Sequence, residues 1–377
     1  MSGTSLDGID AALVDIVPEG ETYRLRTQAA LTVPFEHELA NKIHAAVAPG
    51  APPPREVAAL DKLVGAALGD AAQAVAGGTL AGFVASHGLT LYHDGDASLT
   101  WQLGDPFVLR ERTGATVLYD FRRADCALGG SGAPLVPYAD ALLFGSPERF
   151  RVALNLGGIA NVTLLEPGAG PERARAWDVG PANMLLDAFV RRKTGGQDKY
   201  DRDGRFTADG TVDETALAAL RGDAYFAAPP PKSTGRERFG DAFMAAHAGI
   251  FDRLSLEHGC ATLVELTAVT VADAVAACAD EGDLIVAGGG AANPQLMGAL
   301  ARNLPHFTCM TSERFGIDPA FKEAVAFTIL GYELLRGRPA GLPRVTGARR
   351  PALLGAIVPS GLDGVLARIR EEVGTGK

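Results

Sequence analysis

The sequence predicts an α/β fold built from two domains. The chain has 377 residues, which is longer than one compact core usually grows and fits two domains of ordinary size. Short apolar runs alternate with longer segments whose apolar residues recur at helical spacing. A Gly-Ile pair leads into an apparent strand at Gly8 and again at Gly158, and this echo favours a duplicated α/β unit.

The first residues predict a tight turn followed by a β-meander. Glycine, serine and threonine dominate residues 2–8, a composition typical of turns. Predicted strands follow at residues 11–17 and 23–27, where apolar residues run together or alternate with polar ones. Because a glycine-rich turn normally joins two strands, we expect a further strand to belong before Met1.

The remaining elements alternate between strands and helices. Apolar runs bounded by glycine or charged residues predict buried strands, and they occupy residues 82–85, 116–119, 152–155 and 284–287. Longer segments with apolar residues at helical spacing predict helices, the first two separated by prolines. These segments are residues 35–47, 56–75, 182–193, 241–257, 262–278 and 321–335.

Composition excludes several classes of protein. The chain has 35 lysines and arginines against 45 acidic residues, so its net charge of −10 disfavours binding to nucleic acid. It contains no run of 18 apolar residues and does not open with a secretion signal, so we expect neither membrane insertion nor export. Its four cysteines lack CxxC spacing, which argues against a zinc site or a disulfide scaffold and favours a reducing, cytoplasmic compartment.

Three glycine-rich turns, at residues 2–10, 155–161 and 287–294, form the clearest functional pattern. Small residues let a phosphate group approach backbone N–H groups, and Asp7 could hold a metal-bound water. The third turn does not match the dinucleotide-binding motif GxGxxG, because Asn293 stands at its last position. The P-loop motif GxxxxGK[ST] does not occur in the sequence. One such turn is usually an ordinary hairpin turn, but three together indicate contacts with a nucleotide.

An acidic residue stands at a predicted strand end. Asp178 precedes the helix predicted at residues 182–193, so its carboxylate would face a cleft and could act as a general base. A turn or helix-capping role is the alternative, and for an isolated aspartate it is the more common one.

Three further segments carry polar groups at apparent strand or loop ends. The segment 120–125 places arginines beside carboxylates, which suits an anionic substrate or a structural ion pair equally well. His87 follows a predicted strand, where a structural role is the commoner one. The segment 229–237 combines three prolines with two cations and predicts a rigid loop.

Taken together, these strings resemble the anhydro-N-acetylmuramic acid kinase family, which belongs to the actin, Hsp70 and hexokinase-like superfamily. The resemblance spans almost the whole chain in one order. The strings that carry it include MSGTSLDGID (1–10), SHG (86–88), DFR (120–122), GGSGAPLVP (129–137), LNLGGIANVT (154–163), DVGPANMLLD (178–187), PKSTGRE (231–237) and VAGGGAANP (286–294).

The resemblance implies a duplicated ribonuclease H-like fold with an inter-domain cleft. One lobe would comprise residues 1–130 and 345–377, and the other residues 131–344. It also implies a reaction in which water opens the 1,6-anhydro ring of anhydro-N-acetylmuramic acid while ATP, with Mg²⁺, phosphorylates O6. The expected partner is this small sugar, with neither nucleic acid nor membrane, and a homodimer is left open.

The resemblance also assigns roles to individual residues. Asp178 would be the catalytic base, and Asp7 would hold Mg²⁺ through water. The sugar would contact His87, Arg122, Asn183 and Glu323. The nucleotide would contact Gly3, Thr4, Ser5, Leu6, Asp7, Gly8, Ile9, Asp10, Gly157, Gly158, Gly288, Gly289, Gly290 and Asn293.

Some positions depart from the family pattern. Val179 stands where the family usually has threonine, Ala182 where it has glycine, and Leu89 where it often has glutamine. Two alternatives therefore remain beside the kinase: a nucleotide-bound sensor or scaffold without catalysis, and a kinase of the same fold acting on another sugar or acid.

Overall fold

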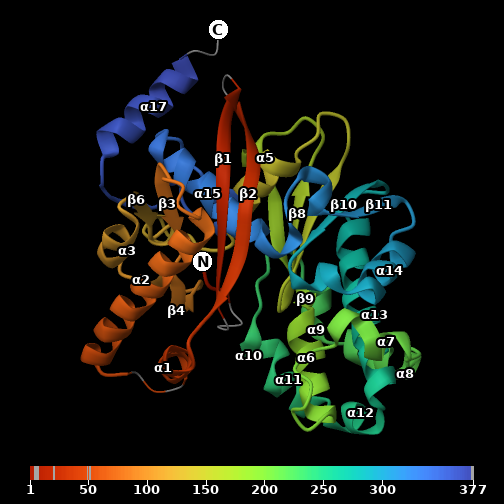
Figure 1. Cartoon of the computed structure of the whole chain (residues 1–377). Helices are drawn as coiled ribbons and strands as arrows, with labels where there is room; N and C mark the ends of the chain where they lie inside the picture. The colour runs from red at the N-terminus through yellow and green to blue at the C-terminus, as the bar shows by residue number, and fades with distance from the viewer. Residues whose placement is uncertain (4–7, 20–21, 49, 51, 375–377) are drawn as a thin grey trace. The chain divides into compact units, whose positions relative to one another are not determined.

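The computed structural model describes residues 1–377 except 4–7, 20–21, 49, 51 and 375–377. The chain forms two compact units, shown in Figure 1. Unit 1 comprises Met1–Ala139 and Phe321–Lys377, and unit 2 comprises Asp140–Ala320. The sequence placed the lobe boundaries after residues 130 and 344, and both positions lie inside unit 1. The chain returns to unit 1 before residue 344 because the helix that begins at Lys322 packs against strands of that unit.

Unit 1 contains a long antiparallel hairpin and a separate three-stranded sheet. The hairpin pairs β1 (Gly8–Glu19) with β2 (Thr22–Pro34), and a bulge interrupts the register between Leu13 and Val14. The sheet has the order β12-β6-β3. Its strands are β3 (Phe83–Ser86), β6 (Thr116–Tyr119) and β12 (Ala356–Val358), with β3 parallel to β6. A small hairpin joins β4 (Leu89–Asp94) and β5 (Leu99–Leu103).

Local sequence explains the helices of unit 1. Helix α2 has a proline in its first turn and ends at Gly77, whose φ of +56° suits glycine. Helix α3 starts where the Asp105 side chain accepts hydrogen bonds from two backbone N–H groups. The helices of this unit are α1 (His37–Val47), α2 (Pro54–Ala76), α3 (Pro106–Thr113), α4 (Arg123–Cys126), α15 (Lys322–Leu335), α16 (Pro343–Thr346) and α17 (Leu362–Gly374); α5 (Val136–Phe144) spans the boundary.

Unit 2 is built on a five-stranded sheet of order β11-β10-β7-β8-β9. Its strands are β7 (Arg151–Leu156), β8 (Ile159–Leu165), β9 (Arg175–Pro181), β10 (Gly282–Ala287) and β11 (Phe307–Thr311). The first three form an antiparallel meander, while β10 and β11 run parallel to β7. This arrangement confirms the predicted α/β class.

Helix α13 (Leu256–Ala276) is the core helix of unit 2. The Ser255 side chain caps its N-terminus, and most of its residues are buried. The helix is long and apolar enough to cross a membrane, but 72% of its apolar stretch is buried inside the protein, as in a core helix. The other helices are α6 (Asn183–Lys193), α7 (Arg205–Ala208), α8 (Glu214–Arg221), α9 (Ala224–Ala227), α10 (Arg236–Phe239), α11 (Asp241–Ala246), α12 (Ala248–Arg253) and α14 (Pro294–Asn303).

The predicted helix at residues 241–257 is wrong as a single element. It consists of α11, α12 and the start of α13, because His247 and Leu254 leave the helical conformation and Ser255 begins a new helix. The predicted strands and the other predicted helices occur within a few residues of their expected limits, although β1 and β2 are longer than predicted.

The packing of α13 against α6 makes a sharp stability test. A Cβ atom at Gly259 would lie 2.0 Å from Cζ of Phe189, a fully buried ring, whereas a Cβ at Gly298 in α14 would have 3.6 Å to its nearest neighbour. We therefore expect Gly259→Ala to lower the free energy of unfolding by about 2 kcal/mol. Gly298→Ala should raise it by about 0.5–1 kcal/mol through helix propensity alone. Thermal unfolding of both variants measures the difference, and equal shifts would contradict the packing described.

Candidate functional site

The carboxylate of Asp178 is held at one oxygen only. Asp178 lies in β9 and is partly buried. Its Oδ2 accepts hydrogen bonds from the backbone N–H of Thr234 at 3.0 Å and from the Ser233 hydroxyl at 3.2 Å. Among the described residues no side chain or backbone group donates to Oδ1. One carboxylate oxygen is thus fixed in place while the other is left for a ligand or water.

The loop that supplies these donors is itself anchored. The carbonyl of Lys232 accepts from the Asp178 backbone N–H at 3.1 Å, so a backbone hydrogen bond ties the loop to β9. The Lys232 ammonium donates to the carbonyls of Tyr225 and Phe226 and lies over the Tyr225 ring. The Tyr225 hydroxyl in turn donates to the Asp178 carbonyl at 2.8 Å. Lys232 therefore fixes the loop rather than facing a ligand.

Burial sets the acidity of this carboxyl. Desolvation raises the pKa of Asp178 above its ordinary value, the hydrogen bonds from Thr234 and Ser233 oppose the rise, and the nearby Glu237 carboxylate adds to it. A carboxylate with a raised pKa is a stronger base than an ordinary surface aspartate, which is the property that proton abstraction requires.

Two of the predicted glycine turns come together in unit 2. Strands β7 and β10 are neighbours, with Ala287 opposite Asn155, so the turns that follow them lie side by side. A Cβ at Gly157 would meet nothing nearer than 3.5 Å, and one at Gly289 nothing nearer than 3.9 Å. Gly288 has a φ of +85°, and a Cβ there would press on Leu156. The open sides of Gly157 and Gly289 leave room for a phosphate or ribose to approach the backbone.

Two asparagines of the predicted site support these turns. The Asn183 side chain donates to the Leu156 carbonyl at 3.0 Å, and its backbone N–H donates to Gly157. The Asn293 oxygen accepts from the backbone N–H groups of Gln295 and Leu296 and so caps α14. Asn183 was expected to contact the sugar and Asn293 the nucleotide, and both contacts stay predictions; in the fold these two side chains shape the turns.

A second polar cluster lies in unit 1 and joins three sequence motifs. Arg122 donates from Nε to Nε2 of His87 at 2.8 Å and from Nη1 to the Gly132 carbonyl at 2.9 Å. Since His87 Nε2 accepts, its proton lies on Nδ1, which is 3.2 Å from the Gly88 carbonyl. Burial, together with the neighbouring Arg122, lowers the pKa of His87 well below its ordinary value. His87 is therefore a neutral group that orients Arg122.

Glu323 faces the same cluster. Burial raises the pKa of its carboxyl, while the positive charges of Arg122 and Lys322 act to lower it. The neighbouring Arg123 does not take part, because it forms an exposed ion pair with Asp120. Arg123 is therefore a structural ion-pair residue, while the substrate contact expected of Arg122 stays a prediction.

The first glycine turn is described only at its ends. Thr4, Ser5, Leu6 and Asp7 lie outside the described residues, so the nucleotide and Mg²⁺ roles expected there stay predictions. Gly3 has open space around its Cβ position, whereas Gly8 packs against the Val33 carbonyl of β2. Ile9 is buried, and Asp10 accepts from the Thr32 hydroxyl at 2.6 Å. In the described part of the chain no three acidic, histidine or cysteine side chains gather to hold a metal ion.

Comparison with known proteins places these motifs in one family. The sequence model of the family "Anhydro-N-acetylmuramic acid kinase" matches residues 1–360. The chain belongs to this family. A protein of that name from Streptomyces coelicolor is 44% identical over 368 residues, covering 95% of this chain and 92% of its own length. Another from Shewanella amazonensis is 41% identical over 375 residues, covering 96% and 97%.

Likeness to solved structures is much weaker. A glucokinase of the ROK family from Streptomyces griseus, in complex with glucose and AMPPNP, is 13% identical. It covers 86% of this chain and 100% of its own, with a TM-score of 0.35. That likeness is too distant to bear on the site.

The departures from the family pattern are accommodated by packing. Val179 is buried in the core of unit 2, at the bulge that interrupts the pairing of β9 with β8. Ala182 is also buried, and its backbone N–H still donates to the Gly158 carbonyl. Leu89 is fully buried in the core of unit 1.

Ser233 and Thr234 are the residues that the sequence analysis missed. It found their loop and predicted its rigidity but gave it no role beside Asp178. The available signal was the adjacent pair of hydroxyl residues after three prolines and a lysine, a stiff segment that ends in hydrogen-bond donors.

Because His87 is neutral in the folded protein, the free energy of unfolding should fall as the pH is lowered. Its pKa in the folded protein is well below 6.5, so below that pH the unfolded chain gains a proton that the folded chain does not. This histidine therefore lowers the free energy of unfolding by up to about 1.4 kcal/mol per pH unit as the pH falls from about 6.5. We expect the loss between pH 6.5 and 5 to be steeper in the natural protein than in His87→Gln. Urea titrations at several pH values measure both slopes, and identical slopes would exclude a neutral buried His87.

Proposed function

We propose that this chain is an ATP-dependent kinase that opens 1,6-anhydro-N-acetylmuramic acid with water and phosphorylates O6, yielding N-acetylmuramic acid 6-phosphate. Membership of the family supports the reaction as a whole. The observation in the structure that supports it best is Asp178, a carboxylate with one oxygen fixed by the 233–234 loop, the other open, and a raised pKa.

The bonding changes assign Asp178 its part. A water oxygen forms a bond to the anomeric carbon, the bond from that carbon to O6 breaks, and the water proton passes to the Asp178 carboxylate. The released O6 accepts the γ-phosphoryl group, and ADP leaves. The base must be held in line with the attacking water, and the two hydrogen bonds to Oδ2 orient Oδ1 for that purpose.

The glycine turns of unit 2 are our proposed nucleotide site. The backbone at Gly157 and Gly289 is open to a ligand, and Asn183 fixes the turn at Gly157 through hydrogen bonds to Leu156 and Gly157. When bound, Mg²⁺ would neutralise charge on the phosphates. Asp7 would hold the ion through water, as proposed from the family pattern.

The cluster in unit 1 is our proposed contact with the sugar. Muramic acid carries a carboxylate, for which the guanidinium of Arg122 is a suitable donor, and His87 and Gly132 orient that guanidinium. The Glu323 carboxylate can accept from a sugar hydroxyl or amide. We further propose that the enzyme works in the cytoplasm in cell-wall recycling.

An assay of the purified protein tests this function. With ATP, Mg²⁺ and the anhydro sugar, ADP should appear in step with the 6-phosphate product, and omission of the sugar should abolish it. ATP binding without sugar-dependent ADP release would instead favour a nucleotide-bound sensor. Turnover of a different sugar in a substrate panel would favour another kinase.

Substitution of the base should affect the rate far more than nucleotide binding. Asp178→Asn keeps the shape of the side chain but removes its basicity, so we expect kcat to fall by roughly 10²–10⁴. The dissociation constant for ATP, measured by calorimetry, should change little. A variant with full activity would show that another group takes the proton.

The hydrogen bonds to Asp178 should be visible in the pH profile. Ser233→Ala removes a donor that stabilises the carboxylate, so the pKa of Asp178 should rise further and the acid limb of kcat/KM should move to higher pH. Thr234→Val is the matched control, since the bond from residue 234 comes from its backbone N–H. Profiles that shift equally in both variants, or in neither, would contradict this role of Ser233.

A further inference from the structure

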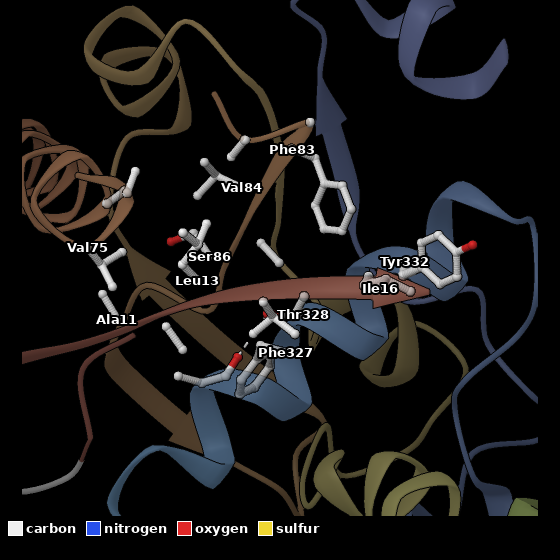
Figure 2. Close-up of a pocket in the computed structure, with 18 of the residues that line it drawn as sticks. Ala11, Leu13, Ile16, Val75, Phe83, Val84, Ser86, Phe327, Thr328 and Tyr332 are labelled. Carbon is white, nitrogen blue, oxygen red and sulfur yellow. Dashed lines mark hydrogen bonds between the residues drawn. The ribbon is translucent and has the colours of Figure 1, made fainter. Parts of the chain in front are cut away.

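The guanidinium of Arg122 is held by a residue of the core and by a loop. The core residue is His87, whose ring lies 4.7 Å from the ring of Phe327 in α15. His87 directly follows Ser86 of β3, and Figure 2 shows Ser86 and Phe327 at the wall of one cavity of unit 1. The second partner is the carbonyl of Gly132, in the loop between α4 and α5. The orientation of Arg122 therefore depends on what fixes Gly132.

The Asp125 carboxylate fixes this loop from the interior of the unit. Asp125 lies in α4 and is fully buried. Its Oδ2 accepts from the backbone N–H of Gly132 at 2.9 Å, and its backbone carbonyl accepts from the N–H of Gly130 at 3.1 Å. A Cβ at Gly132 would lie 2.6 Å from Sγ of Cys126, so the loop passes close to α4. Asp125 thus binds the N–H of the residue whose carbonyl binds Arg122.

Thr346 holds the other oxygen of this carboxylate. The Thr346 hydroxyl, in α16, donates to Oδ1 of Asp125 at 2.8 Å, and both side chains are buried. The Thr346 carbonyl accepts from the backbone N–H of Ser131 at 2.8 Å. One residue therefore contacts both the carboxylate and the loop that the carboxylate fixes, although 221 residues separate it from Asp125 in the chain. Hydrogen bonds thus tie α4 and α16 to residues 130–132.

Burial makes these hydrogen bonds important for the loop. Among the described residues the Asp125 carboxylate forms no ion pair, and its donors are the Gly132 N–H and the Thr346 hydroxyl. A buried carboxylate without a cation beside it is costly, and hydrogen bonds must compensate for the water it has lost. Removal of the hydroxyl would leave one oxygen without a donor, and the carboxylate and the loop would shift to reach water or another donor. The position of Gly132 therefore depends on Thr346.

We propose that Asp125 and Thr346 are positioning residues for the sugar: they place the Gly132 carbonyl and thereby orient the guanidinium of Arg122 toward the sugar carboxylate. This inference rests on the proposed function, in which Arg122 binds that carboxylate. Arg122 donates from Nε to His87 and from Nη1 to Gly132, while no described residue accepts from its Nη2. Two fixed nitrogens hold the planar guanidinium in one orientation and leave the third for the substrate. Because Asp125 and Thr346 are buried, they act through Arg122.

Two substitutions of Thr346 and one matched control test this proposal. Thr346→Val keeps the shape of the side chain and removes the hydroxyl, whereas Thr346→Ser keeps the hydroxyl and removes a methyl group. The control is Thr163→Val, because the Thr163 hydroxyl donates to the Asp140 carboxylate at 2.8 Å and both side chains are buried in unit 2. The two valine variants lose the same kind of buried hydrogen bond, so their melting temperatures should fall by similar amounts.

Steady-state kinetics separates positioning from stability. At a temperature where every variant is folded, we expect Thr346→Val to raise the KM for the anhydro sugar by roughly tenfold, because a hydrogen bond to a charged group is weakened. Its KM for ATP should stay unchanged. Thr346→Ser should keep the natural sugar KM despite its lost methyl group, and so should Thr163→Val. The proposal would be overturned by an unchanged sugar KM in Thr346→Val, or by a sugar KM that rises with the loss of melting temperature in all three variants.

The ring of His87 gives a second readout that needs no substrate. Its Nε2 accepts from Arg122 at 2.8 Å, so a displaced guanidinium should move the NMR resonance of that nitrogen, which His87→Gln assigns. We expect the resonance to move in Thr346→Val and to stay in place in Thr346→Ser and Thr163→Val. A resonance that stays in place in Thr346→Val would contradict the proposal. Absence of sugar turnover by the natural chain would defeat the proposed function instead, while this resonance would still show whether the Asp125–Thr346 pair orients Arg122.

Discussion

The chemistry assigned to this protein depends on how one carboxylate is held. Asp178 has an oxygen fixed by Ser233 and Thr234, while the other makes no hydrogen bond to the described residues. The loop that supplies these donors is fixed by Lys232, which binds two backbone carbonyls behind it. A free, fully solvated aspartate would be a weaker base, and a fully bonded one would have no oxygen left for water. Partial burial with one-sided hydrogen bonding meets both requirements.

The same sheet architecture positions the other groups of unit 2. Parallel pairing of β7 with β10 brings two glycine turns to one edge of the sheet, although about 130 residues separate them in the chain. In unit 1 Arg122 joins the segments at residues 86–88, 120–122 and 129–132. Its hydrogen bonds to His87 and Gly132 fix its guanidinium beside Glu323.

Pattern and spacing were sufficient for the regular elements. Helical periodicity located α2, α6, α13 and α15, and short apolar runs located β3, β6, β7 and β10. The segment 241–257 failed because its composition is helical throughout, while the breaks at His247 and Leu254 depend on how the neighbouring helices pack. The role of the Asn293 oxygen as the cap of α14 is visible only in the fold, and the nucleotide contact expected of Asn293 stays a prediction.

The amino-acid order by itself determined the α/β class, the family and the glycine turns, since each of these is carried by short strings of neighbouring residues, and it also predicted Asp178 as the base. Only the tertiary structure decided which hydroxyl and amide groups reach that carboxylate, and which of two adjacent arginines binds His87. These depend on contacts between segments 35 to 130 residues apart, and such contacts are set by the packing of sheets and helices rather than by any local pattern.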